Sequence, residues 1–239
     1  MNYRLYYWPS IQGRGEFVRL ALEDAGAEYV DVARMSGKGY GVAELMRLLE
    51  RGDPLPFAPP FLQSGRLLIG QTSNILLYLG PRHGLAPKAQ SGRLWTHQLQ
   101  LTLADFVGEA HDTHHPVAAS LYYEDQKKEA RRRAADFLQQ RVPKFLGYFE
   151  RILARNSRGD RFLTGSRATY ADLSLFQVVS GLRYAFPHAA ARAERKCRRV
   201  SSLYRRIEER PRIAAYLASG RRIAFNEDGI FRHYPELDR

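Results

Sequence analysis

The chain has little cysteine and no long apolar run. Its single cysteine, Cys197, excludes an intrachain disulfide framework and a Cys-x-x-Cys redox site. No apolar run approaches the roughly 20 residues that span a bilayer, and the N-terminus lacks the basic segment and apolar stretch of a secretory signal. We therefore expect a globular, cytoplasmic protein that begins near Met1 and has no membrane partner.

The net charge of the chain is strongly positive. The 239 residues carry a net charge of +12, which invites a nucleic-acid interpretation. However, the sequence has no zinc-finger spacing, ribonucleoprotein motif or basic-zipper heptad, and its arginines are spread over many predicted helices, often beside Glu or Asp. We therefore predict no nucleic-acid partner, and we assign the charge to solvated helix faces that also attract anionic small molecules.

The first 52 residues alternate strand and helix patterns. Tyr3–Trp8 follows the strand period of two, which places Tyr7 on the face opposite Tyr6. A helical spacing over 16–25 is closed by a glycine, and a second short strand follows at 29–32. Strand, helix and strand within about 30 residues predict a parallel pair. A weaker helix is expected over 43–49.

Residues 57–80 predict a hairpin followed directly by a helix. Two apolar runs, Phe61-Leu62 and 67–69, flank the turn at Ser64-Gly65. Thr72 or Ser73 can cap the next helix, which Gly80-Pro81 is expected to end. Free amides at the start of this helix, with the helix dipole, attract a carboxylate.

The chain beyond residue 91 is predicted to be helical throughout. Long apolar-periodic segments cover 92–115 and 122–154, and Pro143 inside the second predicts a kink or a helix break near Arg141. Thr169 and Asp172 are spaced as a capping box ahead of an apolar helix over 173–185.

A last helix is expected within 209–219, where Pro211 suits a first-turn position.

The order of these motifs resembles the cytosolic glutathione transferases of the tyrosine type, the Pi, Alpha and Sigma classes. The resemblance extends from Tyr3 to Ser219 and includes the block Tyr7-Trp8-Pro9 ahead of Gly13-Arg14. It implies an α/β thioredoxin-like glutathione-binding domain over 1–81, a linker over 82–91, and an all-helical domain with a C-terminal tail over 92–239. It also implies a cytoplasmic homodimer that uses glutathione as co-substrate in detoxification.

The resemblance assigns roles to individual residues. Tyr7 is the residue implied to activate the glutathione thiol by donating its O–H to the sulfur, with Ser10 as the alternative in serine-type relatives. The residues implied to hold glutathione are Arg14, Pro59, Pro60 as the cis-proline, Gln71, Thr72 and, across the dimer interface, Asp105. Trp8, Ser10, His111, His115 and Phe231 are expected in the pocket for an electrophilic small molecule.

Two features leave alternatives open. Pro59 has no N–H to give to the backbone of glutathione, so a binding protein of the same fold without turnover stays possible. A glutathione-dependent isomerase or peroxidase is a further alternative.

His111 and His115 are spaced i, i+4, as metal ligands on a helix can be, but the adjacent Pro116 marks a helix end, where histidine is favoured by the dipole. We predict no metal site.

Overall fold

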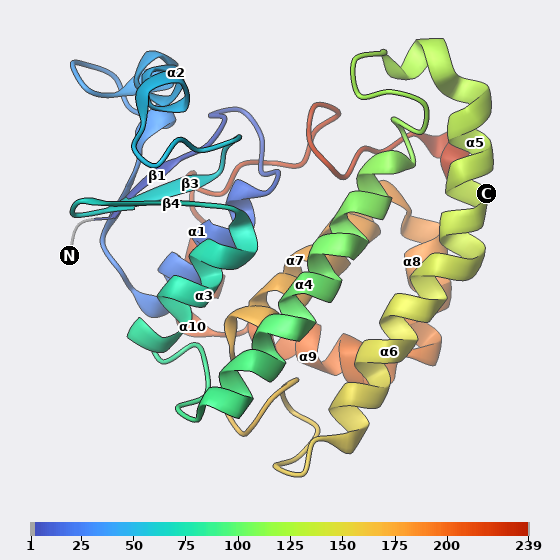
Figure 1. The fold of residues 1–239 in the computed structure, drawn as a ribbon. Helices are drawn as coiled ribbons and strands as arrows, with labels where there is room; N and C mark the ends of the chain where they lie inside the picture. Colours follow the sequence, from blue (N-terminus) through green and yellow to red (C-terminus); the bar gives the residue numbers. More distant parts are fainter. Residues whose placement is uncertain (1–2, 239) are drawn as a thin grey trace.

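A mixed four-stranded sheet forms the first part of the molecule. In the computed structural model, which describes residues 3–238, the strands are β1 (Tyr3–Tyr6), β2 (Tyr29–Asp31), β3 (Phe61–Ser64) and β4 (Leu67–Gly70). Their order is β2-β1-β3-β4. β1 pairs parallel with β2 and antiparallel with β3, and β3 and β4 form the hairpin (Figure 1). Both the predicted parallel pair and the predicted hairpin are confirmed.

The first strand ends two residues earlier than its sequence pattern predicts. Tyr6 pairs with Phe61, so Tyr7 stands opposite Pro60, which has no N–H to continue the ladder. The chain therefore leaves the sheet at Tyr7 rather than at Trp8.

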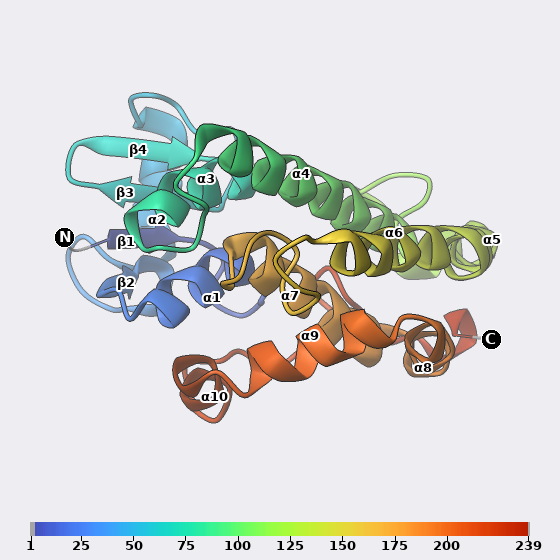
Figure 2. The same ribbon diagram turned by 90° about the horizontal axis from the view of Figure 1, so that it is seen from below.

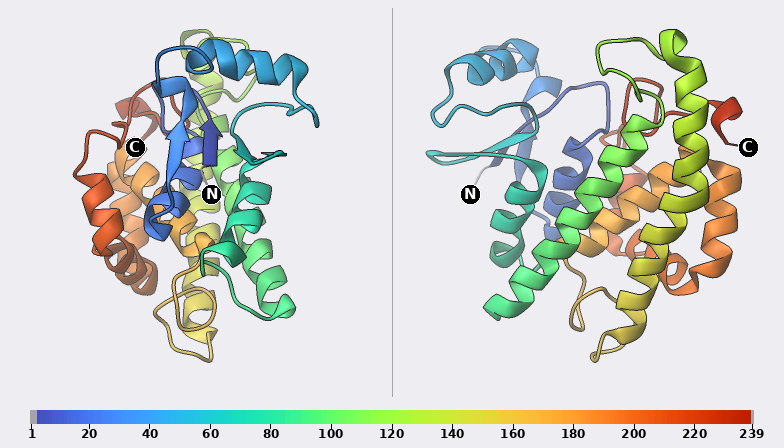
Figure 3. Two further views of the ribbon diagram at one scale, coloured as in Figure 1. Left: turned by 90° about the vertical axis from the view of Figure 1, so that its left-hand side faces the viewer. Right: turned by 45° about the vertical axis from the view of Figure 1, so that its right-hand side comes forward.

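Helices cover both faces of the sheet. α1 (Gly15–Ala25) and α3 (Thr72–Arg82) lie on one face, and α2 (Gly41–Arg51), preceded by the short helix η1 (Val32–Arg34), lies on the other (Figure 3). Leu5, Val18 and Ile75 belong to the apolar cluster on the first face, whereas Tyr6 and Leu45 belong to the cluster on the second. The alternation predicted for the first strand is thus confirmed.

The start and the end of α3 differ from the sequence expectation. The helix begins after Gln71, which has a φ of 67°, and neither Thr72 nor Ser73 caps it. Pro81 does not stop the helix, which continues to Arg82, because a proline near the last turn removes only one backbone hydrogen bond.

The second part of the molecule is helical. Its α-helices are α4 (Gln90–Asp112), α5 (Lys127–Asp136), α6 (Val142–Arg155), α7 (Tyr170–Ala185), α8 (Pro187–Lys196), α9 (Arg198–Glu208) and α10 (Pro211–Leu217). Pro211 occupies the first turn of α10, as predicted. Short helices η2 (Tyr123–Gln126) and η4 (Pro235–Leu237) complete the described residues. This sheet beside a helical bundle confirms the predicted fold class (Figure 2).

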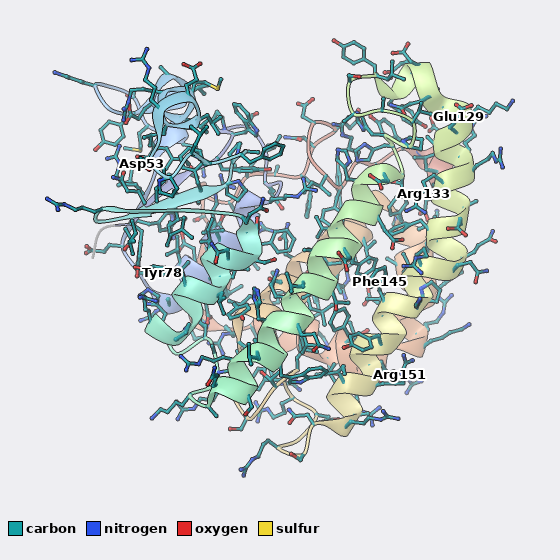
Figure 4. All side chains as sticks on the ribbon, viewed as in Figure 1. Asp53, Tyr78, Glu129, Arg133, Phe145 and Arg151 are labelled. Carbon is teal, nitrogen blue, oxygen red and sulfur yellow. The ribbon has the colours of Figure 1, made fainter. Side chains whose placement is uncertain are left out.

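The predicted kink is a π-helical segment. η3 (Phe137–Arg141) joins α5 to α6 immediately before Pro143, which stands in the first turn of α6. The wider π turn accommodates the proline without breaking the long helical run. Phe145 extends from α6 toward α4 (Figure 4), where its ring stacks on Phe106 with centroids 4.3 Å apart.

The core of the helical part depends on α7, whose side chains are buried on nearly every side. Its N-terminus carries the predicted capping box. Asp172 accepts hydrogen bonds at 2.7 Å from the N–H and the hydroxyl of Thr169, and a third at 2.7 Å from the N–H of Leu163. One buried carboxylate therefore fixes both the start of α7 and the loop that precedes it.

Among residues 3–238, no helix combines the length and apolarity needed to cross a membrane.

Replacing Asp172 with Asn should destabilise the fold. Both carboxylate oxygens of Asp172 accept hydrogen bonds, so in asparagine the NH₂ that replaces one of them faces a donor instead of accepting from it. At least one buried hydrogen bond to a charged acceptor is therefore lost. We expect a loss of about 2–4 kcal/mol in the free energy of unfolding, measured by urea denaturation. Asp160→Asn, at an exposed position, is the control. Equal stability of the two variants would contradict the structural role of the capping box.

Candidate functional site

A cleft lies where the beginnings of α1 and α3 face the middle of α4. It encloses about 70 Å³. One side is polar and comes from the N-terminal ends of α1 and α3, and the other comes from α4. The lining residues are Arg14, Phe17, Gln71, Thr72, Ser73, Gln100, Leu103, Ala104 and Val107. None of these residues carries a negative charge.

The start of α3 provides the anion-binding part of this cleft. The first hydrogen bond of the helix runs from the N–H of Ile75 to the carbonyl of Gln71 at 2.9 Å, so the three preceding amides have no acceptor within the helix. The positive φ of Gln71 is rare for a residue other than glycine, and such backbone positions concentrate at functional sites. With Arg14 lining the same cleft, this corner suits a carboxylate.

Tyr7 lies beneath the backbone of the loop that leads into α1. Its hydroxyl oxygen accepts a hydrogen bond at 2.9 Å from the N–H of Arg14. A Cβ atom on Gly13 would lie 2.0 Å from this hydroxyl, and one on Gly15 would lie 2.5 Å from the ring. Both positions therefore need glycine, and the two glycines seat the ring against the loop.

The environment keeps the Tyr7 hydroxyl protonated. Its side chain is only 5% exposed. Burial raises the pKa of Tyr7, and the N–H of Arg14 and the charge of Arg19 oppose this only in part. The oxygen accepts from Arg14 and retains its own proton, which is free to be donated to a bound anion.

The loop that holds Tyr7 is anchored by a buried polar network. Fully buried Glu16 accepts from the hydroxyl of Tyr216 at 2.8 Å and also binds Arg222. Arg222 donates to the side-chain oxygen Oε1 of Gln177 at 2.9 Å, and the side-chain amide of Gln177 donates to Oε1 of Gln12 at 2.8 Å. The network thereby connects α1, α7, α10 and the C-terminal segment.

Fully buried Arg19 continues the network toward the sheet. It donates to Asp31 at 2.8 Å and pairs with Glu16 at 3.2 Å. The guanidinium of Arg19 therefore ties the start of α1 to the end of β2.

The C-terminal segment runs from α10 past the same loop to η4, at the other end of the helical part (Figure 1). Asn226 donates to the backbone carbonyl of Ser10 at 2.8 Å, and Gln12 donates to the carbonyl of Ile223. Further along, a nitrogen of His114 lies 2.8 Å from the carbonyl of Ile230. The segment thus bridges the two parts of the molecule.

The structure brings only some of the predicted site residues together. Arg14, Gln71 and Thr72 line the cleft, whereas Tyr7 does not line it but accepts a hydrogen bond from the backbone N–H of Arg14. The peptide bond between Pro59 and Pro60 is cis, so that prediction is confirmed.

Other predicted residues do not line the cleft. Trp8 packs in the cluster beneath α2, and the Ser10 side chain and Asp105 are exposed. His111 and His115 stack at the end of α4 with centroids 5.1 Å apart. Phe231 is buried beside Gly181 and lines a small cavity under the C-terminal segment with Gly13.

Sequence reasoning missed several cleft residues. Phe17, Ser73, Leu103 and Val107 form its walls, and Gln100 is buried in it. The only feature of the sequence that could have singled out Gln100 is its helical spacing, which puts this polar residue on the same face of the helix as apolar positions such as Leu103.

Across residues 3–238, no group of three or more His, Cys, Asp or Glu side chains is arranged to hold a metal ion.

Comparison with known proteins shows that the chain is similar to glutathione S-transferases. A family model described as the glutathione S-transferase C-terminal domain matches residues 111–220. A glutathione S-transferase of Plasmodium falciparum is 26% identical over 191 residues, which cover 78% of this chain and 82% of that protein. Glutathione S-transferase P 1 of Xenopus laevis is 26% identical over 231 residues, which cover 92% of this chain and 94% of that protein.

The fold is similar to solved structures as well. A Pi-class glutathione S-transferase of Onchocerca volvulus superposes with a TM-score of 0.69 at 21% identity, covering 91% of this chain and 92% of that one. Rat hPGDS complexed with a quinoline superposes with a TM-score of 0.68 at 20% identity, covering 91% and 96%.

The docking of the C-terminal segment should depend on pH through His114. Burial lowers the pKa of His114 to about 3, against an unfolded value near 6.5. Its contribution to stability is therefore present above about pH 6.5 and is lost as the pH falls toward 3, at about 1.4 kcal/mol per pH unit. Between pH 7.5 and 5.5, wild type should lose about 1.4 kcal/mol more unfolding free energy than His114→Gln, measured by urea denaturation. Parallel pH profiles of the two proteins would contradict this role.

Proposed function

We propose that the chain belongs to the cytosolic glutathione transferase family, that its cleft binds glutathione, and that Tyr7 activates the bound thiol for addition to an electrophilic small molecule. The observation that carries this proposal is the cleft at the α3 N-terminus, which Arg14 lines while its backbone N–H donates to the Tyr7 hydroxyl. We further propose a detoxifying role in the cytoplasm, which the sequence resemblance supports.

The cleft suits the γ-glutamyl end of glutathione. Its α-carboxylate would accept from the free amides of Thr72 and Ser73 and lie near the Arg14 guanidinium. Gln71 and Thr72 are therefore proposed as the carboxylate-binding pair, and the carbonyl of Pro59 is left to accept from the cysteinyl N–H. Pro59 gives no N–H in return, so the backbone of glutathione is held by one hydrogen bond fewer at this position.

Thiol activation follows from the protonated state of Tyr7. A thiol with a pKa near 8.5 is only a few per cent thiolate at pH 7. A neutral hydroxyl that donates to sulfur stabilises the anion, and so lowers the thiol pKa by about 1–2 units. The bond from the Arg14 N–H increases this effect, because it polarises the same hydroxyl toward donation.

Ser10 is less well placed for this role. Its side chain is exposed, and its backbone carbonyl is used by Asn226. We therefore propose a tyrosine-type enzyme.

We also propose that the protein is a homodimer. Phe57 is 95% exposed, and Leu94 and Leu101 on α4 are 63% and 49% exposed. Leu94, Leu101 and Asp105 follow helical spacing and share one face of α4. Covering these apolar side chains with a second copy would remove them from water, and would carry Asp105 to the interface, where it could reach the partner's cleft.

Tyr7→Phe tests the catalytic assignment. The ring and its packing are kept while the O–H is removed, so glutathione should still bind and its thiol pKa should rise by about 1–2 units toward 8.5. Turnover with a chromogenic electrophile at pH 7 should fall by about 8- to 25-fold, because the thiolate fraction falls by that factor. Ultraviolet absorbance of the bound thiolate, titrated with pH, gives the value directly.

Ser10→Ala is the matched control and should leave the titration unchanged. If Ser10→Ala shifts the curve and Tyr7→Phe does not, the serine is the activator. A wild-type protein that binds glutathione without lowering its thiol pKa would identify a binding protein without turnover.

Phe57→Ser tests the dimer. Removing an aromatic side chain that is inserted into a second copy should raise the dimer dissociation constant by at least about tenfold. Analytical ultracentrifugation over a concentration series measures it, with Leu55→Ser, also exposed on the same loop, as the control. A wild-type protein that sediments as a monomer at all concentrations would refute the dimer.

A further inference from the structure

A further cavity lies between the segment that joins α3 to α4 and the loop that precedes α7 (Figure 1). A hydrogen bond from the N–H of Tyr170 to the carbonyl of Leu85, at 2.9 Å, ties these two segments together. The cavity has a volume of about 540 Å³, within the range of about 300–1,000 Å³ that is usual for small-molecule sites. Its lining residues come from 81–93 and 164–169, and none of them lines the cleft of the candidate site. We call it the junction groove.

The charged side chains of the junction groove are all cations. Lys88, Arg93 and Arg167 line it, and no Asp or Glu does. None of these three cations takes part in an ion pair within residues 3–238. Arg93 is half-buried, so the groove removes part of its hydration without supplying a counter-charge.

Arginines beside neighbouring cavities do have a carboxylate partner. In the adjoining cavity, which shares Arg167 with the junction groove, Arg210 binds Asp24 through two bonds of 2.6 and 2.8 Å. Arg183, which lines a cavity beside α8, pairs with Glu194 at 2.6 Å. The cations of the junction groove are therefore the ones left to meet an anion from solution.

The lining of the groove indicates the chemistry of that anion. A phosphate monoester carries a charge of about −1.5 to −2 at pH 7, so a terminal diphosphate carries about three negative charges and matches the three cations. Guanidinium groups bind phosphate oxygens in pairs, and a lysine adds a point charge. Ser166 supplies a neutral hydroxyl donor, and an attached organic group has an apolar wall in Pro81, Ala86 and Pro87.

We propose that the junction groove binds a small molecule that carries a diphosphate group, with Lys88, Arg93 and Arg167 as the ligands of the phosphate oxygens. The site is separate from the cleft, so it does not depend on glutathione binding. Its two walls belong to segments far apart in the sequence. A bound diphosphate therefore holds the segment after α3 against the loop before α7, and stabilises the folded protein.

The test measures binding of adenosine diphosphate (ADP) by isothermal titration calorimetry without magnesium, which would itself neutralise the diphosphate. ADP should bind with a Kd below about 1 mM, and adenosine monophosphate about tenfold more weakly, because one charged group is lost. Inorganic pyrophosphate separates two sources of the same group. Equal affinity identifies the free anion as sufficient, and weaker binding identifies an organic diphosphate. No saturable binding of ADP or pyrophosphate up to about 5 mM would overturn the proposal.

The combined variant Lys88→Gln, Arg93→Gln and Arg167→Gln locates the site. Its affinity for ADP should fall by at least about 30-fold, because three charge-assisted contacts are lost. Its melting temperature without ligand should stay close to that of wild type, since these cations make no ion pair in the folded protein. ADP should raise the melting temperature of wild type and leave that of the variant unchanged.

A matched control removes one lysine and two arginines elsewhere. Lys144→Gln, Arg155→Gln and Arg158→Gln, all at exposed positions, should together change the affinity by less than about twofold. An equal loss in both combined variants would show that ADP responds only to net charge, and would overturn the site. So would competition in which saturating glutathione displaces ADP, since that places ADP in the cleft. If the protein binds ADP but not glutathione, the proposed function fails and the junction groove stands.

Discussion

The segment between β1 and α1 depends on a buried charge network, because the sheet cannot hold it. The backbone ladder stops at Tyr6, since the next position across the pair is Pro60. From Tyr7 onward the chain is fixed by Glu16 and Arg19, both fully buried, and by the side chain of Gln12. The position of the Tyr7 hydroxyl is therefore set by contacts to α7, α10 and the C-terminal segment rather than by the strand that precedes it.

The network is close to electrically balanced. Glu16 and Asp31 pair with Arg19 and Arg222, and the more exposed Arg34 adds a longer contact to Asp31 at 3.9 Å. Burial alone lowers the pKa of Arg19, but the two carboxylates outweigh it and raise the pKa overall, so the group stays charged. A buried group of this kind adds little net stability compared with apolar packing, yet removal of one member leaves a partner unpaired at a cost of about 3–5 kcal/mol. Its effect is thus to make one arrangement of the loop much better than any other.

Features with local signals were predictable from the sequence. The hairpin, the disturbance of the helix before Pro143 and the Thr169–Asp172 capping box each depend on residues close together in the chain, with proline, glycine or a capping side chain marking the position. The carboxylate corner at the start of α3 belongs to the same class, although Gln71 rather than Thr72 occupies the cap position.

Features that depend on distant pairing were not predictable. The early end of β1 needs the register between Tyr6 and Phe61, and the network needs Gln12 to meet Gln177, 165 residues away. The burial of Gln100 could not be read either, because its position in α4 fits both an apolar core face and a ligand-binding wall. Periodicity gives the face of a helix, but it does not say what the face meets.

The electrostatics of the cleft and of Tyr7 act in the same direction. The lining residues include a guanidinium and no carboxylate, and the chain as a whole carries a net charge of +12, so an anionic ligand is attracted to the cleft. The proposed activation of a bound thiol needs a hydroxyl that keeps its proton, and burial raises the pKa of Tyr7 so that it remains a donor well above neutral pH. A lower pKa would make the tyrosine a competing anion beside the thiolate. Burial of the ring thus raises the cost of ionising the tyrosine, and under the proposed function it leaves the thiol as the group that gives up its proton.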